Sequence, residues 1–256
     1  MKIEGGWVIT DLVPHRPVVP EATREMHQEL SGSLIVVEGA DGSGRTTQIE
    51  LLTEWLEHCG HAVETMGLRR SYLVARNLDE VMGRNVVTRT TLSLLYATDF
   101  FDQLENRILP ALRSGFVVLA DRYFYSLVVR AVVRGIPSDY LEEIYRIARK
   151  PDLAFRLDVS PRVAFDRTFA DKGEISFWES GRDLHLKDDL FASFLEYQSL
   201  LRKQFDQLAE RNDFLIIDGE ASVSNVNEKL RLHIGKLLGI EDLSFQPTSF
   251  FGSNWD

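Results

Sequence analysis

Cysteine is almost absent from this chain of 256 residues, which carries only Cys59. An internal disulfide is therefore excluded, and the composition fits a protein of the reducing cytoplasm. No catalytic pattern of cysteine and histidine surrounds Cys59, so we expect it to be a small apolar side chain near the end of a helix.

Long apolar runs are missing as well, because no stretch reaches the about 18 consecutive apolar residues that a membrane-spanning helix needs. The first residues lack the basic and then apolar pattern of a signal peptide, so we expect neither export nor a membrane partner. The sequence also has no internal repeat and no low-complexity linker. These absences predict a folded protein located in the cytoplasm.

Positive charge is in short supply, with 29 lysines and arginines against 39 aspartates and glutamates and a formal net charge of −10. An acidic surface repels the phosphate backbone of nucleic acids, so we expect no nucleic-acid polymer as partner. Small anions can still bind wherever arginine side chains converge. The positions of the arginines therefore matter more than their number.

Apolar runs alternate with helical patterns along most of the chain. The runs that predict strands are residues 34–38, 61–66, 116–120, 153–159 and 214–217. The patterns that predict helices are residues 46–59, 72–82, 88–113, 125–133, 138–149, 186–211 and 224–238, with another helix starting at Pro161. This alternation predicts an α/β fold of three layers, a parallel sheet flanked by helices on both faces. We assign residues 34–239 to this domain, 1–33 to an N-terminal extension and 240–256 to a C-terminal tail.

A glycine-rich turn follows the first predicted strand and precedes a helix, which is the setting of a phosphate-binding loop. Its pattern is G-x-x-x-x-G-R-T, and the glycines let backbone N–H groups turn toward phosphate oxygens. The helix adds its positive dipole end at the same place. The residues that we expect to bind ATP are Gly39, Asp41, Gly42, Ser43, Gly44, Arg45, Thr46 and Thr47.

Arg45 occupies the position where this motif usually has lysine, and two interpretations stay open. A planar, bidentate guanidinium could bridge the β- and γ-phosphates as a catalytic group. It could equally mark a regulatory protein that binds nucleotide without turning it over. Thr46 is the expected ligand of a magnesium ion.

The loop at residues 37–48 and four further segments resemble the thymidylate kinase family, and together they cover about residues 34–235 in the right order. The four segments are Asp121-Arg122-Tyr123 with Ser126, residues 150–153 with 157–159, residues 94–99, and residues 108–112. The resemblance implies a P-loop fold of the nucleoside monophosphate kinase type, with ATP and Mg²⁺ as cofactors and small-molecule nucleotides as partners. It also suggests a homodimer, and a lid at residues 168–181, which we expect to be an exposed loop.

The same resemblance implies the roles of individual residues. The catalytic group would comprise Arg45, Arg122, Asp121 and Asp41, with Thr46 and Asp121 at the metal. The acceptor nucleotide would contact Arg70, Tyr96, Arg122 and Asp183. For Tyr96 the alternative is plain core packing, because it shares an apolar stripe with Leu92 and Phe100.

The acceptor is predicted to carry a phosphate already. A nucleoside hydroxyl needs a general base, whereas a monophosphate is itself a good nucleophile. After the second strand the chain offers Arg69 and Arg70 and no carboxylate until Asp79. The leading hypothesis is therefore transfer from ATP to a nucleoside monophosphate, dTMP first, with a deoxynucleoside kinase as the alternative enzyme.

Three positions depart from the family at the expected acceptor site. Phe100 stands where the family usually has an arginine that contacts thymine, Leu127 replaces a polar side chain, and Arg130 stands where bacterial members often have tyrosine. The acceptor could therefore be another deoxynucleotide or a modified pyrimidine. The lid is also unusual, since its central cation is Lys172, and its aromatic Phe177 and Trp178 could clamp over nucleotide or dock the lid on the body.

Overall fold

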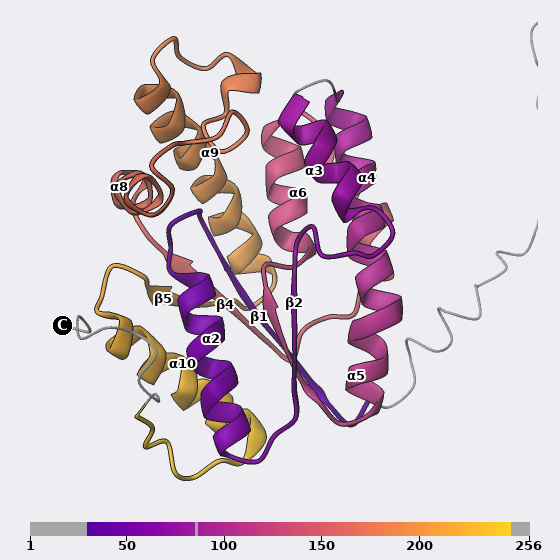
Figure 1. Ribbon diagram of the computed structural model, residues 1–256, viewed down its shortest axis with the longest axis vertical. Helices are drawn as coiled ribbons and strands as arrows, with labels where there is room; N and C mark the ends of the chain where they lie inside the picture. The colour runs from indigo at the N-terminus through magenta and orange to yellow at the C-terminus, as the bar shows by residue number, and fades with distance from the viewer. Residues whose placement is uncertain (1–29, 85–86, 247–256) are drawn as a thin grey trace, which may run out of the picture.

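The computed structural model describes residues 30–84 and 87–246 of the chain (Figure 1). Within them lies a five-stranded sheet with the order β2-β3-β1-β4-β5, in which every neighbouring pair is parallel. The strands are β1 (Ser33–Gly39), β2 (Val63–Gly67), β3 (Val117–Asp121), β4 (Leu153–Asp158) and β5 (Leu215–Asp218). The predicted N-terminal extension and C-terminal tail lie largely outside the described residues.

Helices connect the strands and continue beyond the last one. They are α2 (Arg45–His58), α3 (Ala75–Arg84), α4 (Arg89–Gln103), α5 (Leu109–Arg113), α6 (Phe124–Val133), α7 (Ser138–Tyr145), α8 (Pro161–Lys172), α9 (Leu190–Arg211) and α10 (Val223–Leu238). A π-helical segment, Leu104–Ile108, joins α4 to α5, and a short 3-10 helix, Arg182–Leu184, precedes α9. Within the described residues, none of the helices combines the length and apolar character needed to cross a membrane.

The central strand β1 divides its side chains between two cores, because successive strand residues point to opposite faces. Leu34 and Val36 pack in a core with residues of α4, α5, α6 and α7, whereas Ile35 and Val37 pack with residues of α2 and α10. Figure 1 shows α2 and α10 side by side on one side of the strands and α4, α5 and α6 on the other. The three-layer α/β class that the sequence predicts is thus confirmed.

Residues 168–181 differ from the predicted exposed loop. Helix α8 continues through Lys172 and ends at Gly173, which adopts the left-handed conformation that favours glycine as a helix stop. In the segment that follows, Ile175, Trp178 and Ser180 are buried. The prediction of an exposed loop is therefore wrong for the helical residues up to Lys172 and for these buried side chains, whereas Phe169 and Phe177 are exposed as predicted.

Two helix starts also differ from their predictions. Helix α3 begins three residues later than expected, and Tyr72 before it is 95% exposed. Helix α9 begins after Asp189, whose carboxylate accepts a hydrogen bond from the N–H of Ala192 at 2.7 Å. Such an N-cap satisfies an N–H group that the first turn leaves unpaired, so the helix starts there rather than at residue 186.

The strand order brings the carboxyl ends of β1 and β3 together. Val37 pairs with Asp121 in the parallel register, and the N–H of Arg122 donates to the carbonyl of Val37 at 3.0 Å. Ligands of open α/β sheets bind at this edge of the sheet. The loop after β1 and the residues after β3 therefore face the same space.

Candidate active site

The loop between β1 and α2 approaches α8 closely, and glycine permits this approach. Gly42 has a φ of 73°, and a Cβ there would lie 2.6 Å from the carbonyl oxygen of Ala164. Gly44, with a φ of 89°, is the N-cap of α2. The loop thus wraps the start of α2 in the manner predicted for a phosphate-binding loop.

Arg45 lies inside this loop instead of extending away from it. Its Nη1 donates to the carbonyl of Gly39 at 2.7 Å, to the carbonyl of Ala40 and to Ser43 Oγ at 3.0 Å. Its Nε donates to Asp121 Oδ1 at 2.8 Å. The larger guanidinium is accommodated because loop oxygens take up its extra donors.

Asp121 connects the loop to the end of β3. Its second oxygen, Oδ2, accepts a hydrogen bond from Thr46 Oγ1 at 2.9 Å. Burial alone would raise the pKa of Asp121, but Arg45 and Arg122 outweigh burial and hold this pKa below its usual range. The carboxylate is therefore charged at neutral pH and lies beside a hydroxyl oxygen.

A cavity of about 500 Å³, which we call the loop cavity, lies over this loop. Its lining comprises residues 41–48 of the loop and α2, Arg167, Thr168, Asp171 and Lys172 of α8, and Gly219, Ala221, Val223 and Val226 near the start of α10. Arg167 is held by the carbonyl of Gly219, which accepts from its Nη1 at 2.7 Å. All the predicted ATP-binding residues except Gly39 line this cavity. The carbonyl of Gly39 instead accepts a hydrogen bond from Arg45.

Asp41 holds two arginines beside the loop. Its Oδ1 accepts from Arg122 Nη2 at 2.5 Å, and its Oδ2 accepts from Arg130 Nη2 at 2.7 Å. Burial would raise the pKa of Asp41, but Arg122 and then Arg130 outweigh burial and keep this pKa far below its usual range. Burial, together with Arg45, lowers the pKa of Arg122 to about 10, so this guanidinium is still charged at neutral pH.

A second cavity of about 230 Å³, the arginine cavity, lies next to the loop cavity. Its lining includes Arg45, Arg69, Arg70, Arg122, Arg130 and Lys172. Such a concentration of cations in a chain with net negative charge is suited to phosphate groups. The structure thus brings Arg70, Arg122 and Arg45 together, as the sequence predicts.

Asp99 of α4 stabilises the turn that carries Arg70 by hydrogen bonds to its backbone. Asp99 is fully buried and accepts hydrogen bonds from the N–H groups of Arg69 at 2.8 Å and Ser71 at 3.0 Å. Arg69 has a φ of 61°, which is uncommon for a residue other than glycine. Asp99 therefore stabilises a turn whose backbone conformation is unfavourable by itself.

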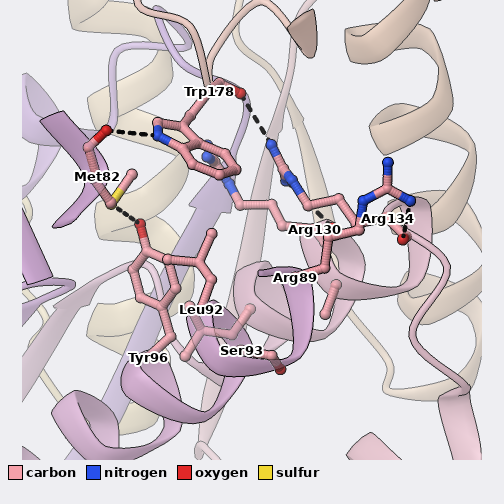
Figure 2. A pocket seen from close by; sticks show the side chains of 10 residues that line it. Met82, Arg89, Leu92, Ser93, Tyr96, Arg130, Arg134 and Trp178 are labelled. Carbon is pink, nitrogen blue, oxygen red and sulfur yellow. Dashed lines mark hydrogen bonds between the residues drawn. The ribbon is translucent and has the colours of Figure 1, made fainter. Parts of the chain in front are cut away.

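A narrow pocket, the side pocket, opens from the arginine cavity between α3, α4 and α6. It is lined by Met82, Arg89, Leu92, Ser93, Tyr96, Leu127, Arg130, Ala131, Arg134 and Trp178. Figure 2 shows Tyr96 directed at the Met82 sulfur, and the hydroxyl lies 3.1 Å from it. Tyr96 thus lines a pocket and also packs against two core clusters, so its predicted role and plain core packing both stay open.

Phe100 lies elsewhere. It is fully buried and makes edge-on contacts with Tyr123 and Tyr145, at centroid distances of 4.9 and 5.6 Å. The position where the family usually has an arginine is therefore part of the core here. Leu127 and Arg130, the other two departures, do line the side pocket.

Asp183 lies in a buried ion pair with Arg134. Its two oxygens accept from Arg134 Nε at 2.9 Å and Nη2 at 3.2 Å. The remaining N–H groups of Arg134 reach the carbonyls of Arg130 and Trp178 and the hydroxyl of Tyr197. Asp183 therefore supports the wall of the side pocket through Arg134, whereas we expected it to contact the acceptor itself.

Residues far apart in the sequence contribute features that no local motif signals. Glu38, at the end of β1, accepts from the N–H groups of Tyr123 at 2.9 Å and Ser126 at 3.1 Å, so it fixes the start of α6. Burial raises the pKa of Glu38, partly offset by its bond with Ser126. Arg134 and Asp99 likewise have roles that no local motif signals, because their partners come from distant parts of the sequence.

The comparisons with known proteins agree with this geometry. The family model of thymidylate kinase matches residues 37–230. A protein named probable thymidylate kinase 2 from Saccharolobus solfataricus is 36% identical over 210 residues, covering 82% of this chain and 98% of that protein. A probable thymidylate kinase from Pyrococcus abyssi is 33% identical over 208 residues, with 78% and 95% covered. The thymidylate kinase of Brachyspira hyodysenteriae is 28% identical over 169 residues, with 65% and 83% covered. This chain therefore belongs to the thymidylate kinase family.

Proposed function

We propose that the protein transfers the γ-phosphoryl group of ATP to dTMP, giving ADP and dTDP. The observation that carries this proposal is the meeting of two cavities at three shared residues. Asp41, Arg45 and Lys172 line both the loop cavity and the arginine cavity. The phosphate groups of nucleotides bound in the two cavities can therefore meet at these residues.

The loop cavity suits the donor nucleotide. Backbone N–H groups of the loop and the start of α2 favour its phosphates. Arg45 and Arg167 add positive charge, and the residues near the start of α10 leave room for the nucleoside. Phosphoryl transfer depends on positioning and on charge stabilisation more than on covalent chemistry, so these groups match its requirements.

A magnesium ion fits the pair formed by Thr46 and Asp121. Mg²⁺ prefers oxygen ligands and commonly binds one or two protein groups together with phosphates and water. Thr46 Oγ1 and Asp121 Oδ2, 2.9 Å apart, are two such oxygens. The described residues hold no cluster of three or more His, Cys, Asp or Glu residues suited to a metal. When bound, the ion would neutralise charge on the donor phosphates.

The arginine cavity suits the phosphate of the acceptor. Arg70 and Arg122 offer guanidinium forks to its oxygens, and Tyr96, which lines both the arginine cavity and the side pocket, offers its ring to the base. This phosphate attacks through its own oxygen, so no general base is required. Lys172, whose Nζ donates to Glu179 at 2.5 Å, can turn to the transferring phosphate from the lid side.

Steady-state ADP production from Mg·ATP tests the proposal, with dTMP first and then the other nucleoside and deoxynucleoside monophosphates. We expect turnover that depends on dTMP and stops when EDTA removes Mg²⁺. Thymidine in place of dTMP tests the deoxynucleoside kinase alternative and should give no ADP. Tight ATP binding without turnover on any acceptor would instead leave the nucleotide-binding regulatory protein.

Two family-derived expectations complete the proposal. We expect the protein to act in the cytoplasm and to form a homodimer. Sedimentation velocity at micromolar concentration checks the second, because a dimer of this 29.2 kDa chain sediments as a species of twice the mass.

A further inference from the structure

The side pocket is too small for the group that it is proposed to hold. It encloses about 30 Å³, whereas an apolar cavity that accepts a benzene ring measures about 150 Å³. A pyrimidine base has a ring of the same size. Tyr96 and Trp178 also line the arginine cavity, so the base can approach from that side. If the proposed function is right, a base seated wholly in the side pocket requires part of the pocket wall to move.

Trp178 is the wall residue best placed to move. The other lining residues belong to α3, α4 and α6 or directly follow α6, whereas Trp178 lies in the irregular segment after α8. Figure 2 shows its indole across the pocket from Tyr96, with Nε1 pointing to the carbonyl of Met82 at 2.9 Å. This bond is the one side-chain hydrogen bond that the indole can make.

Space for this movement exists on the far side of Trp178. The indole also lines a wider cavity of about 690 Å³, the outer cavity, together with Arg69, Asp79, Gly83 and Phe177. A rotation of the indole toward the outer cavity breaks its bond to Met82 and opens the side pocket. Burial of the base against Leu92 and Leu127 then offsets the lost bond.

The backbone of Trp178 is held, and its buried side chain is held by the bond to Met82 and by packing against Leu78 and Leu92, so entry of the base must displace the indole from these contacts. Arg134 Nη2 donates to the Trp178 carbonyl at 3.1 Å, and Asp183 fixes Arg134 in turn. The guanidinium also lies 5.5 Å from the indole centroid, a cation–π contact. The pivot is therefore fixed, and the space that opens depends on the size of the side chain at position 178.

We propose that Trp178 determines the specificity of the protein for the acceptor base. A partly displaced indole leaves room for one six-membered ring beside Tyr96. Indole and purine are both two-ring systems, so removal of the indole leaves room for a purine. Trp178 thus selects pyrimidine monophosphates over purine monophosphates by size.

The first experiment compares kcat/KM for dTMP and dGMP in the native protein and in Trp178→Ala. We expect the ratio of dGMP to dTMP to rise by at least about tenfold, while the KM for ATP stays within about twofold, since a pocket discriminates by volume and the donor cavity is separate. Phe169→Ala, an exposed aromatic of α8, is the matched control and should leave the ratio unchanged. An unchanged ratio in Trp178→Ala overturns the proposal.

A binding experiment tests the role of Trp178 without turnover. It uses the native protein and Trp178→Phe, so it also serves if Trp178→Ala does not fold. Titration of the native protein with dTMP, and with dGMP as the purine, should change tryptophan emission for dTMP because the indole leaves its pocket. The change should be lost in Trp178→Phe, which keeps an aromatic roof. Persistence of the full signal in Trp178→Phe overturns the proposal. Absence of turnover with every acceptor contradicts the proposed kinase activity alone, because this titration still reports on Trp178.

Discussion

The loop cavity and the side pocket both adjoin the arginine cavity, yet they are constructed in opposite ways. One continuous segment, residues 41–48, supplies half of the lining of the loop cavity. The side pocket takes its lining from α3, α4, α6 and the segment after α8. A site made from one segment is specified by a motif, whereas a site made from several helices is specified by packing.

This difference explains which substitutions each region tolerates. The loop accommodates arginine in place of the usual lysine at position 45, because Gly39, Ala40 and Ser43 supply oxygens for the larger guanidinium. In the side pocket, Leu127 replaces a polar family residue and removes a hydrogen-bonding group. We therefore expect substitutions in the loop cavity to lower the reaction rate strongly. Substitutions in the side pocket should instead change the selectivity for the acceptor.

The largest effect is expected at Arg45. Arg45→Ala should lower kcat by about 10³-fold, because the guanidinium both holds the loop and lines the two cavities where the phosphates meet, and one group that stabilises the transition state contributes on this scale. The KM for dTMP should change little. Arg45→Lys retains the charge at the usual motif position and should stay within about tenfold of the native rate. Steady-state ADP production checks both variants, and an Arg45→Ala rate within tenfold of native would show that the loop does not depend on this cation.

The next largest effect is expected at Asp41, on stability. Asp41→Asn leaves Arg122 and Arg130 close together without their shared carboxylate, which should cost about 3 kcal/mol at pH 7. The pKa of Asp41 is lowered in the folded protein, so its contribution is present above the unfolded pKa of about 3.9 and is lost below it. The difference between native and variant should therefore shrink by about 1.4 kcal/mol for each pH unit below about 4.

Urea unfolding at pH 7, 4 and 3 measures this difference. Asp166→Asn is the matched control, because Asp166 pairs with Arg162 on the surface and should contribute less than about 1 kcal/mol. A difference for Asp41→Asn that stays constant from pH 7 to pH 3 would contradict the assigned charge state of Asp41.

The same contrast shows how much of this protein could be predicted from its sequence. Strands, their order along the chain and the phosphate loop follow from local patterns of apolar residues and glycine. Asp121 and Arg122 were predictable too, because the end of a buried parallel strand faces the site whatever packs around it. These predictions need no knowledge of long-range contacts.

Side-chain direction on the helices could not be predicted in the same way. Tyr96 and Phe100 lie one turn apart on α4, but Tyr96 lines a pocket and Phe100 contacts Tyr123 in the core. Likewise, a polar and glycine-containing sequence predicted exposure for residues 168–181, although Trp178 packs with Leu78 and Leu92. Burial of this kind is decided by partners that are distant in the sequence.

Two adjacent arginines, Arg70 and Arg69, are compared by the effect of their loss on the KM for dTMP. Arg70 lines the arginine cavity, and its loss should raise the KM for dTMP about 30-fold, the value of one charged hydrogen-bonding group of about 2 kcal/mol. Arg69 lines the same cavity but is the matched comparison, because its half-exposed guanidinium already pairs with Asp79 at 3.0 Å. Arg69→Ala should change this KM by less than about threefold. Equal effects of the two variants would contradict the assignment of the phosphate to Arg70.

The smallest effect is expected at Asp99, which acts only through the turn above it. Asp99→Asn places an NH₂ group opposite one of two backbone N–H donors, which should loosen the turn and raise the KM for dTMP about fivefold without changing kcat, a cost of about 1 kcal/mol. The double variant with Arg70→Ala separates positioning from general destabilisation. If Asp99 serves to position Arg70, its change should add nothing to the KM once Arg70 is absent, because the two energies are then coupled and not additive. A fivefold rise in both backgrounds would show that Asp99 supports the acceptor site by a route independent of Arg70.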